Sequence, residues 1–121
     1  MSIFVFGSNR KGIHGAGTAR IAAQEYGAQF GVGEGRTGQA YAIPTKETPY
    51  KRLRLSEVRE GVERFLIYAR EHPELEFRVV RIGCGLAGFT NGEMAPLFDG
   101  APANCRFDPL WEKYGLKPWK Q

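Results

Sequence analysis

Residues 3–17 read IFVFGSNRKGIHGAG, an apolar run that passes through a glycine-rich loop into small residues typical of a helix. Four consecutive apolar residues that stop at Gly7 are typical of a buried strand. The alanines of residues 15–26 recur on one helical face, so a helix there can pack closely on a sheet. Gly27 follows as a C-cap. This stretch therefore predicts a strand, a loop and a helix in an α/β domain.

The remainder of the chain continues this alternation. We expect further strands over residues 40–43, 77–82 and 104–107, and helices over residues 55–71 and 91–98. The helix at 55–71 is the clearest, because its apolar residues recur with the period of an amphipathic helix. Strands that alternate with helices predict a three-layer α/β/α fold around a mostly parallel or mixed sheet.

Two connections are expected to lack regular structure. Residues 31–38 contain four glycines and predict a loop. Pro44 is expected to end the strand at 40–43. Residues 46–54 are polar and basic and include a proline, so they predict an exposed connection.

The 121 residues leave room for one domain. We assign residues 1–107 to it and residues 108–121 to an aromatic tail that packs on the same domain. No apolar run approaches the ~20 residues needed to span a bilayer. The N-terminal apolar run lacks a basic flank and ends too soon for a signal peptide. We therefore expect a cytoplasmic protein without membrane contact.

Composition restricts the chemistry further. Cys84 and Cys105 match no zinc-binding spacing and form no disulfide framework, so we expect two reduced thiols, no metal and no cofactor. The net charge of +4 favours an anionic ligand or a nucleic acid. No catalytic Ser-His-Asp or His-Glu-x-x-His pattern is present.

The glycine-rich loops next to strand ends carry the functional signal. Residues 83–88 match G-x-G-x-x-G between a strand and a short helix, the context in which main-chain amides hold phosphate. Residues 33–38 match the same pattern but precede a strand, so we do not interpret them as a dinucleotide fingerprint. No acidic residue follows 83–88 at the expected ribose position, about 20 residues on within a second βαβ unit, which disfavours a nicotinamide-dependent dehydrogenase.

The loop over residues 7–17 is the second candidate binding loop. The amide of Asn9 is suited to a ribose hydroxyl, and Arg10 and Lys11 to phosphate, although Ser8 and Asn9 equally suit a turn cap. As catalytic candidates we take Asn9, His14 and Glu34, with Glu93 as a further acid–base group. A surface ion pair is an equal alternative for Glu34.

These loops resemble, in kind and in order, those of the macrodomain family over residues 3–98. Ser8-Asn9 resembles the family's strand that ends in an asparagine near the distal ribose. Residues 12–17 resemble its loop around the diphosphate, and residues 38–45 its glycine turn and strand before the long helix. Residues 81–89 look like its second phosphate loop, with Phe89 stacking near the distal ribose. The chain is most similar to short phage and bacterial members of uncharacterised function.

The resemblance implies binding of ADP-ribose or an ADP-ribosyl group, and it leaves open whether an ADP-ribosyl linkage is hydrolysed. The family's early Gly-Asp-Ile stretch, whose aspartate reads adenine, has no counterpart here. The predicted ligand-binding residues are Ser8, Asn9, Gly12, Gly15, Ala16, Gly17, Gly83, Cys84, Gly85, Leu86, Ala87, Gly88 and Phe89.

Two alternatives remain open. One is a phage-type nucleic-acid-binding protein that uses residues 46–54 with Tyr50, together with the aromatic tail. The other is a non-enzymatic assembly component that docks through the tail between Trp111 and Trp119. The partner is accordingly a small nucleotide, a nucleic acid or an ADP-ribosylated macromolecule, and the oligomeric state stays open.

Overall fold

A six-stranded mixed sheet forms the centre of the protein in the computed structural model, which describes residues 2–120. The strands follow the order β2-β3-β1-β5-β6, with β4 paired to the far end of β3. Four of them, β3, β1, β5 and β6, run parallel, whereas β2 and β4 are antiparallel to β3. Their bounds are β1 Ser2–Asn9, β2 Gly35–Thr37, β3 Ala40–Thr48, β4 Lys51–Arg52, β5 Glu76–Val79 and β6 Cys105–Phe107.

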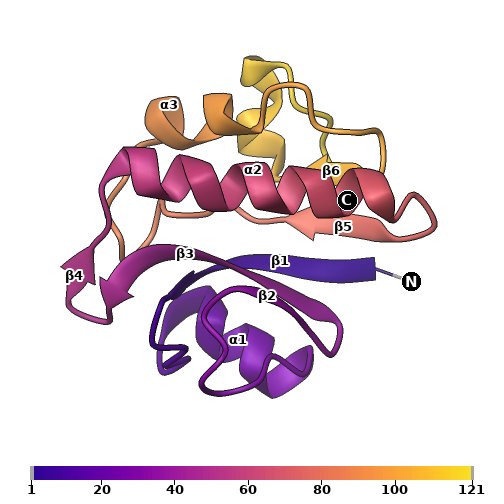
Figure 1. The fold of residues 1–121 in the computed structure, drawn as a ribbon. Coiled ribbons are helices and arrows are strands. Elements are labelled where there is room, and N and C mark those ends of the chain that lie inside the picture. The colour runs from indigo at the N-terminus through magenta and orange to yellow at the C-terminus, as the bar shows by residue number, and fades with distance from the viewer. Residues whose placement is uncertain (1, 121) are drawn as a thin grey trace.

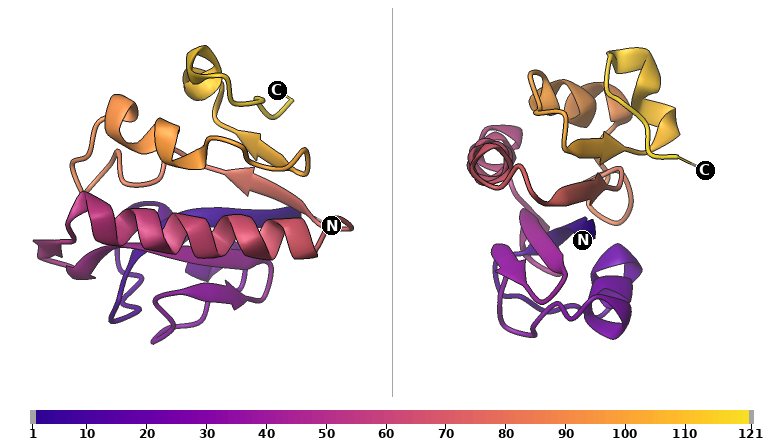
Figure 2. Two further views of the ribbon diagram at one scale, coloured as in Figure 1. Left: turned by 45° about the horizontal axis from the view of Figure 1, so that its top comes forward. Right: turned by 90° about the vertical axis from the view of Figure 1, so that its right-hand side faces the viewer.

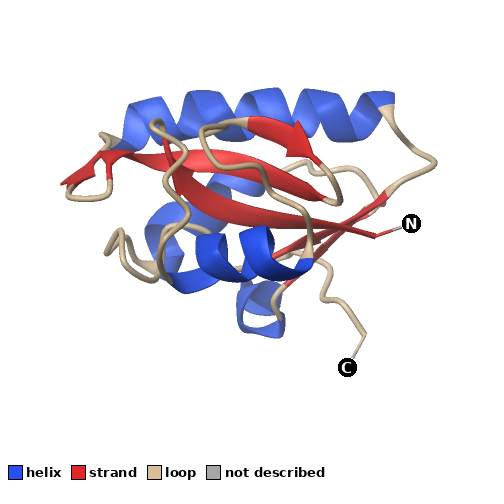
Figure 3. Cartoon of the chain, turned by 90° about the horizontal axis from the view of Figure 1, so that it is seen from below, coloured by secondary structure: helices blue, strands red, loops and turns tan. Residues whose placement is uncertain are grey.

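Helices lie on both sides of this sheet (Figures 1 and 2). Helix α1 (Gly17–Glu25) covers one face, and the long helix α2 (Leu55–Glu71) covers the other. The short helix α3 (Asn91–Met94) and the 3-10 helices η1 (Ala95–Phe98) and η2 (Pro109–Tyr114) lie on the α2 side. Figure 3 shows the molecule from below the view of Figure 1, with the sheet between the two main helices. The predicted alternation of strands and helices in an α/β fold is therefore confirmed.

The core is divided between the two faces because side chains of a strand alternate. Ile3 and Val5 of β1 join the larger cluster with α2, whereas Phe4 and Phe6 join the smaller cluster with α1. A strand buried on both faces must be apolar throughout, which explains the run over residues 3–6. The small face of α1, with its buried Ala19 and Ala22, packs on the sheet as predicted.

The expectation that residues 31–38 form only a loop is wrong. Gly35–Thr37 is strand β2, which pairs with the first residues of β3 across a tight turn at Gly38. Gly38 has φ +58°, and a Cβ there would lie 2.8 Å from the carbonyl oxygen of Gly27. Strand β2 has three residues and is held by main-chain hydrogen bonds. Such a strand needs no alternating apolar pattern, so nothing in the sequence indicated it.

The expected stop at Pro44 and the irregular connection at 46–54 are also wrong. Strand β3 passes through Pro44, pairs with β1 along one edge and continues to Thr48, and β4 returns from a turn. On the other edge, β2 pairing ends at Ala42 and β4 pairing begins at Lys46. Pro44 therefore lies where that edge of β3 is open, the kind of position that tolerates a residue without an amide hydrogen.

Other bounds differ by a few residues. The predicted strand over 77–82 ends at Val79, because the chain then turns and the Ile82 amide donates to the Val80 carbonyl at 2.7 Å. The predicted helix over 91–98 is divided into α3 and η1.

The C-terminal tail is joined to the sheet. The Phe107 amide donates to the Lys117 carbonyl, and the Trp119 amide donates to the Phe107 carbonyl at 2.9 Å. Trp111 is fully buried against Phe98 and Phe107 and belongs to the larger core cluster. Within residues 2–120, no helix is long and apolar enough to cross a membrane.

Candidate functional site

A cleft of about 830 Å³ lies across the carboxyl ends of the four parallel strands. Thr45 and Lys46 of β3 line it on one side, and Ser8 and Asn9 of β1 line its centre. Beyond them come Val80 and Arg81 after β5 and then Asp108 after β6. This is the place where α/β folds bind ligands, because the loops that follow parallel strands converge there.

Asn9 shapes the first loop through its own side chain. Its Oδ1 accepts from the Ile13 amide at 3.1 Å, and its Nδ2 donates to the Ile13 carbonyl at 2.9 Å. The Ser8 hydroxyl donates to the Gly33 carbonyl, which joins this loop to the next one. Ser8 and Asn9 are 2 % and 4 % exposed, so their main role in the structure is to position the loop.

The first loop leads into the N-terminus of α1, where several main-chain amides are unoccupied. Ala16 is the N-cap residue, with extended backbone and no side-chain acceptor for the first-turn amides. Within residues 2–120, the amides of residues 15–19 donate to no protein group. Residues 15–19 all line the cleft. Such amides, aligned with the helix dipole, favour an anion.

The second loop also presents main-chain amides. Its turn is closed by bonds from the Gly88 amide to the Gly85 carbonyl, at 3.0 Å, and from the Phe89 amide to the Gly83 carbonyl, at 2.8 Å. The amides of residues 85–87 have no partner in the described part of the chain. A Cβ added at Gly85 would meet no atom within 4 Å, so this glycine faces open space.

Of the predicted ligand-binding residues, ten line the cleft: Ser8, Asn9, Gly15, Ala16, Gly17, Gly83, Cys84, Gly85, Leu86 and Ala87. Gly12, Gly88 and Phe89 do not. Gly12 has φ +70°, and its Cβ position is 2.4 Å from backbone atoms of Gly31 and Val32, so it serves close packing of two loops. Phe89 is buried, with the Arg52 guanidinium 4.4 Å above its ring.

His14 does not line the cleft either. It is 3 % exposed and packs edge-on against the rings of Phe6 and Phe30. Its Nε2 is 3.1 Å from the Gln29 carbonyl oxygen, which can only accept, so Nε2 carries the hydrogen. Its Nδ1 is buried and has no hydrogen-bond partner among residues 2–120. The structure gives His14 a packing role between two loops.

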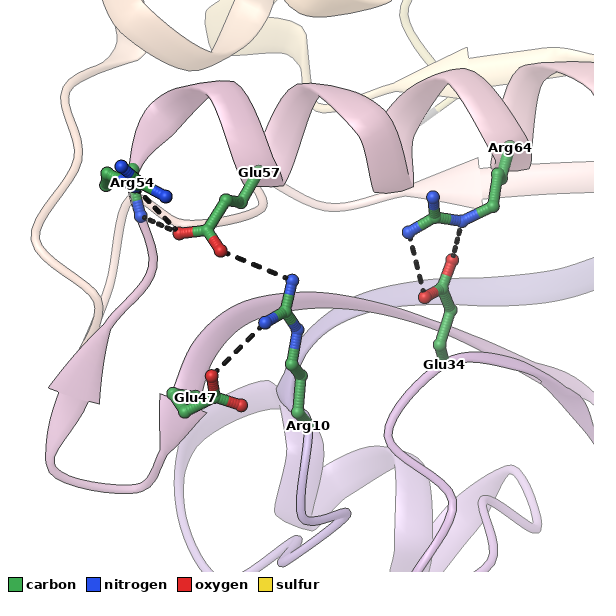
Figure 4. Close-up of polar contacts among 6 residues, drawn as sticks. All are labelled: Arg10, Glu34, Glu47, Arg54, Glu57 and Arg64. Atoms are coloured by element: carbon green, nitrogen blue, oxygen red, sulfur yellow. Dashed lines mark hydrogen bonds and ion pairs between the residues drawn. The ribbon is translucent and has the colours of Figure 1, made fainter.

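Glu34 lies outside the cleft and forms an ion pair with Arg64 of α2 (Figure 4). Its second oxygen accepts from Arg64 Nη2 at 3.0 Å, which makes the contact bidentate. The surface ion pair that was the alternative for Glu34 is the arrangement found.

Arg10 is also engaged elsewhere. Its guanidinium lies 3.2 Å from Glu47 and 3.6 Å from Glu57, at the start of α2 (Figure 4). The Arg54 main-chain amide lowers the pKa of Glu57, and the Arg54 and Arg10 side chains add to this effect. Arg10 therefore joins the first loop to β3 and α2 and does not line the cleft.

Cys84, expected to be a reduced thiol, lies in the second loop and lines the cleft. Its sulfur is 3.7 Å from the Ile82 carbonyl oxygen. Burial raises the pKa of the Cys84 thiol, with Glu93 adding to the rise and Arg81 opposing it. A thiol with a raised pKa is protonated near neutral pH and is a poor nucleophile.

Several cleft residues were not among the predicted ligand-binding residues: Thr45, Lys46, Pro49, Tyr50, Val80, Arg81, Asp108 and Trp119. Arg81 and Asp108 each follow a strand closely, and the rule that ligands bind at carboxyl ends of strands points to such positions. Tyr50 lies in the turn between β3 and β4 and is 97 % exposed. Its position could not be found while 46–54 was expected to be irregular.

Comparison of the sequence with models of known families found no match. A search of curated proteins likewise found no similar protein. In the described chain, no three side chains of His, Cys, Asp or Glu gather as they would to hold a metal ion.

Proposed function

We propose that the cleft binds a nucleotide diphosphate, ADP-ribose or an ADP-ribosyl group, with the diphosphate on main-chain amides. One observation carries this proposal: unpartnered amides of residues 15–19 and of residues 85–87 line the same cleft. Amides from two separate loops that border one cavity are suited to bind oxyanions, and the α1 dipole favours negative charge at the same place.

The arrangement of the fold supports the same proposal. With α1 on one face of a mostly parallel sheet and α2 on the other, a macrodomain-like three-layer fold is the form we propose. The two loops follow β1 and β5, which are neighbours in the sheet. A diphosphate that lies over these two strand ends reaches both sets of amides.

The proposal is one of binding. Asn9 is the one predicted catalytic residue that lines the cleft, and both ends of its amide already bind Ile13. Hydrolysis of an ADP-ribosyl linkage stays a prediction from the family resemblance, without an assigned base.

The two alternatives receive less support. Three of the four basic side chains in residues 46–54 are engaged: Arg52 lies over Phe89, Arg54 pairs with Glu57, and Lys46 donates to the Pro49 carbonyl. A nucleic-acid surface would need such cations free for phosphates. In the tail, Trp111 is buried in the core and is not available for docking.

Gly85→Val tests the proposed function. A Cβ at this position meets no protein atom, so the variant should fold with an unchanged thermal midpoint in the absence of ligand. The branched side chain would, however, occupy the space beside the amides of residues 85–87. We expect ADP-ribose at about 100 times its Kd to stabilise the wild type by about 2.7 kcal/mol and to leave Gly85→Val unaffected.

Thermal denaturation and isothermal titration calorimetry measure both effects. Gly92→Ala, in α3 and outside the cleft, is the control and should respond to ADP-ribose like the wild type. A wild type with a clean transition and no shift at millimolar ADP-ribose would contradict the proposal. Equal affinity in a folded Gly85→Val variant would remove the second loop from the site.

A further inference from the structure

The end of the cleft at β6 differs in chemistry from its centre. It is lined by Asp108, which follows β6, and by Trp119 of the tail. The tail is held there by main-chain hydrogen bonds with Phe107, of 2.8 Å and 2.9 Å. The indole of Trp119 is therefore attached to the sheet at a defined place.

Trp119 is suited to stack on a flat ring. The Arg78 guanidinium lies 4.4 Å from the centre of the indole and supports it. The ring is partly exposed and lines the cleft. An aromatic side chain in such a position can bind a nucleobase by stacking, which by itself does not distinguish between bases.

Asp108 supplies the group that can distinguish them. Its Oδ1 accepts from the Leu110 amide at 2.9 Å, which fixes the orientation of the carboxylate. Its Oδ2 is 3.8 Å from Arg81 Nε, too far for a hydrogen bond, and can still accept one. Asp108 is the one carboxylate that lines the cleft within residues 2–120.

A carboxylate repels phosphate but accepts hydrogen bonds from an uncharged N–H group. The amide loops follow β1 and β5, and β6 is the next strand, about 4.8 Å further along the sheet. A nucleoside joined to a diphosphate over β1 and β5 can extend in this direction and meet Asp108 and Trp119.

We propose that the β6 end of the cleft is a base subsite that selects an amine-bearing base such as adenine. Trp119 stacks on the ring, and Asp108 Oδ2 accepts from the exocyclic amine. Hypoxanthine has a carbonyl in place of that amine. Its carbonyl oxygen and Asp108 Oδ2 are both hydrogen-bond acceptors and would face each other without a hydrogen between them. This inference rests on the proposed function and adds to it the residues that select the base and the direction of the ligand in the cleft.

Calorimetry with three probes tests this subsite: ADP-ribose, its hypoxanthine counterpart IDP-ribose, and ribose 5-diphosphate, which has no base. The wild type should prefer ADP-ribose over IDP-ribose by about tenfold or more, the cost of one unmatched polar pair. Asp108→Asn retains an oxygen for the Leu110 amide and adds an N–H donor, so the preference should vanish or reverse. Asp99→Asn, an exposed aspartate outside the cleft, is the control and should keep the preference.

Trp119 gives a second readout. Trp119→Ala should weaken ADP-ribose and IDP-ribose alike, by about tenfold, and leave ribose 5-diphosphate unchanged. ADP-ribose should also change the tryptophan fluorescence of the wild type but not that of Trp119→Phe, in which the buried Trp111 is the remaining tryptophan.

The outcomes separate the two proposals. Equal wild-type affinity for ADP-ribose and IDP-ribose, unaltered in Asp108→Asn, would overturn the base subsite while the proposed function stands. Failure of all three probes to bind would overturn both.

Discussion

At the scale of single residues, Glu34 and Arg64 form a bidentate pair between the loop before β2 and helix α2. Their side chains are 34 % and 53 % exposed, so solvent screens the attraction. We therefore expect Glu34→Gln to lower the free energy of unfolding by no more than about 1 kcal/mol. It should leave ADP-ribose affinity unchanged, because Glu34 does not line the cleft.

Urea denaturation and calorimetry measure the two quantities. Glu63→Gln, an exposed carboxylate on α2, is the matched control and should alter neither. If Glu34→Gln instead lost affinity while keeping its stability, Glu34 would return to the site as a ligand-contacting residue.

The residue types in the sequence predicted many of the residues that line the cleft. They did not predict which residues of the chain contact one another. Ser8 and Asn9 line the cleft because they are the last residues of strand β1, and a strand end can be recognised locally. The partner of Glu34 lies 30 residues further along the chain. The carbonyl that His14 contacts belongs to Gln29. Such contacts depend on how loops meet in three dimensions, which no local pattern contains.

At the scale of elements, the end of α2 is held by one side chain from a distant segment. Asn104 Nδ2 lies within 3.0–3.1 Å of the carbonyl oxygens of Ala69, His72 and Leu75. It therefore holds the last turn of α2 and the chain that leads into β5. We expect Asn104→Ala to lower the free energy of unfolding by about 1–3 kcal/mol, because three carbonyls lose the hydrogen bonds from this side chain.

Asn104→Asp tests whether the side chain stabilises the end of α2 by donating hydrogen bonds or by its shape. Aspartate has the same size but places a carboxylate oxygen against three carbonyl oxygens, so it should destabilise at least as much as alanine. Chemical denaturation of both variants measures this. Wild-type stability in Asn104→Asp would show that Asn104 does not act as a donor.

Elements with their own apolar pattern were predictable, whereas those held by main-chain pairing were not. Helix α2 occupies the predicted residues because its buried face repeats with helical period. Strand β2 has three residues, and β4 has two, and neither is buried. These strands form because they pair with the edge of β3 through main-chain hydrogen bonds.

At the scale of the whole molecule, the cleft is formed by segments from across the chain, from Gly7 to Trp119. The glycine loops could be predicted because each lies beside a strand with a recognisable pattern. The β6 end could not be predicted, because Trp119 reaches the cleft only through tail pairing with Phe107. The aromatic tail of the sequence thus serves two purposes: Trp111 packs in the core and Trp119 lines the cleft.

The buried core also sets how the whole molecule responds to alkali. Burial raises the pKa of Tyr41 from 10.0 to about 12, with the charge of Glu34 adding to the rise. Burial likewise raises the pKa of Cys105 from 9.0 to about 12. Between the lower pKa of each group, in the unfolded chain, and its higher pKa, in the folded protein, the unfolded chain loses a proton that the folded protein keeps. The stability that each group contributes is therefore present in full below its lower pKa and falls as pH rises toward its higher pKa. Each group should lower the free energy of unfolding by about 1.4 kcal/mol per pH unit within its window.

Urea denaturation from about pH 8 to about pH 11.5 measures this slope. Tyr41→Phe keeps the ring that packs on Phe65 and removes the ionisable hydroxyl, so its stability should fall less steeply above about pH 10. Cys105→Ala serves as the companion variant and should reduce the slope from about pH 9 upward. A slope that is unchanged in both variants would show that these two groups are not the ones that titrate on unfolding.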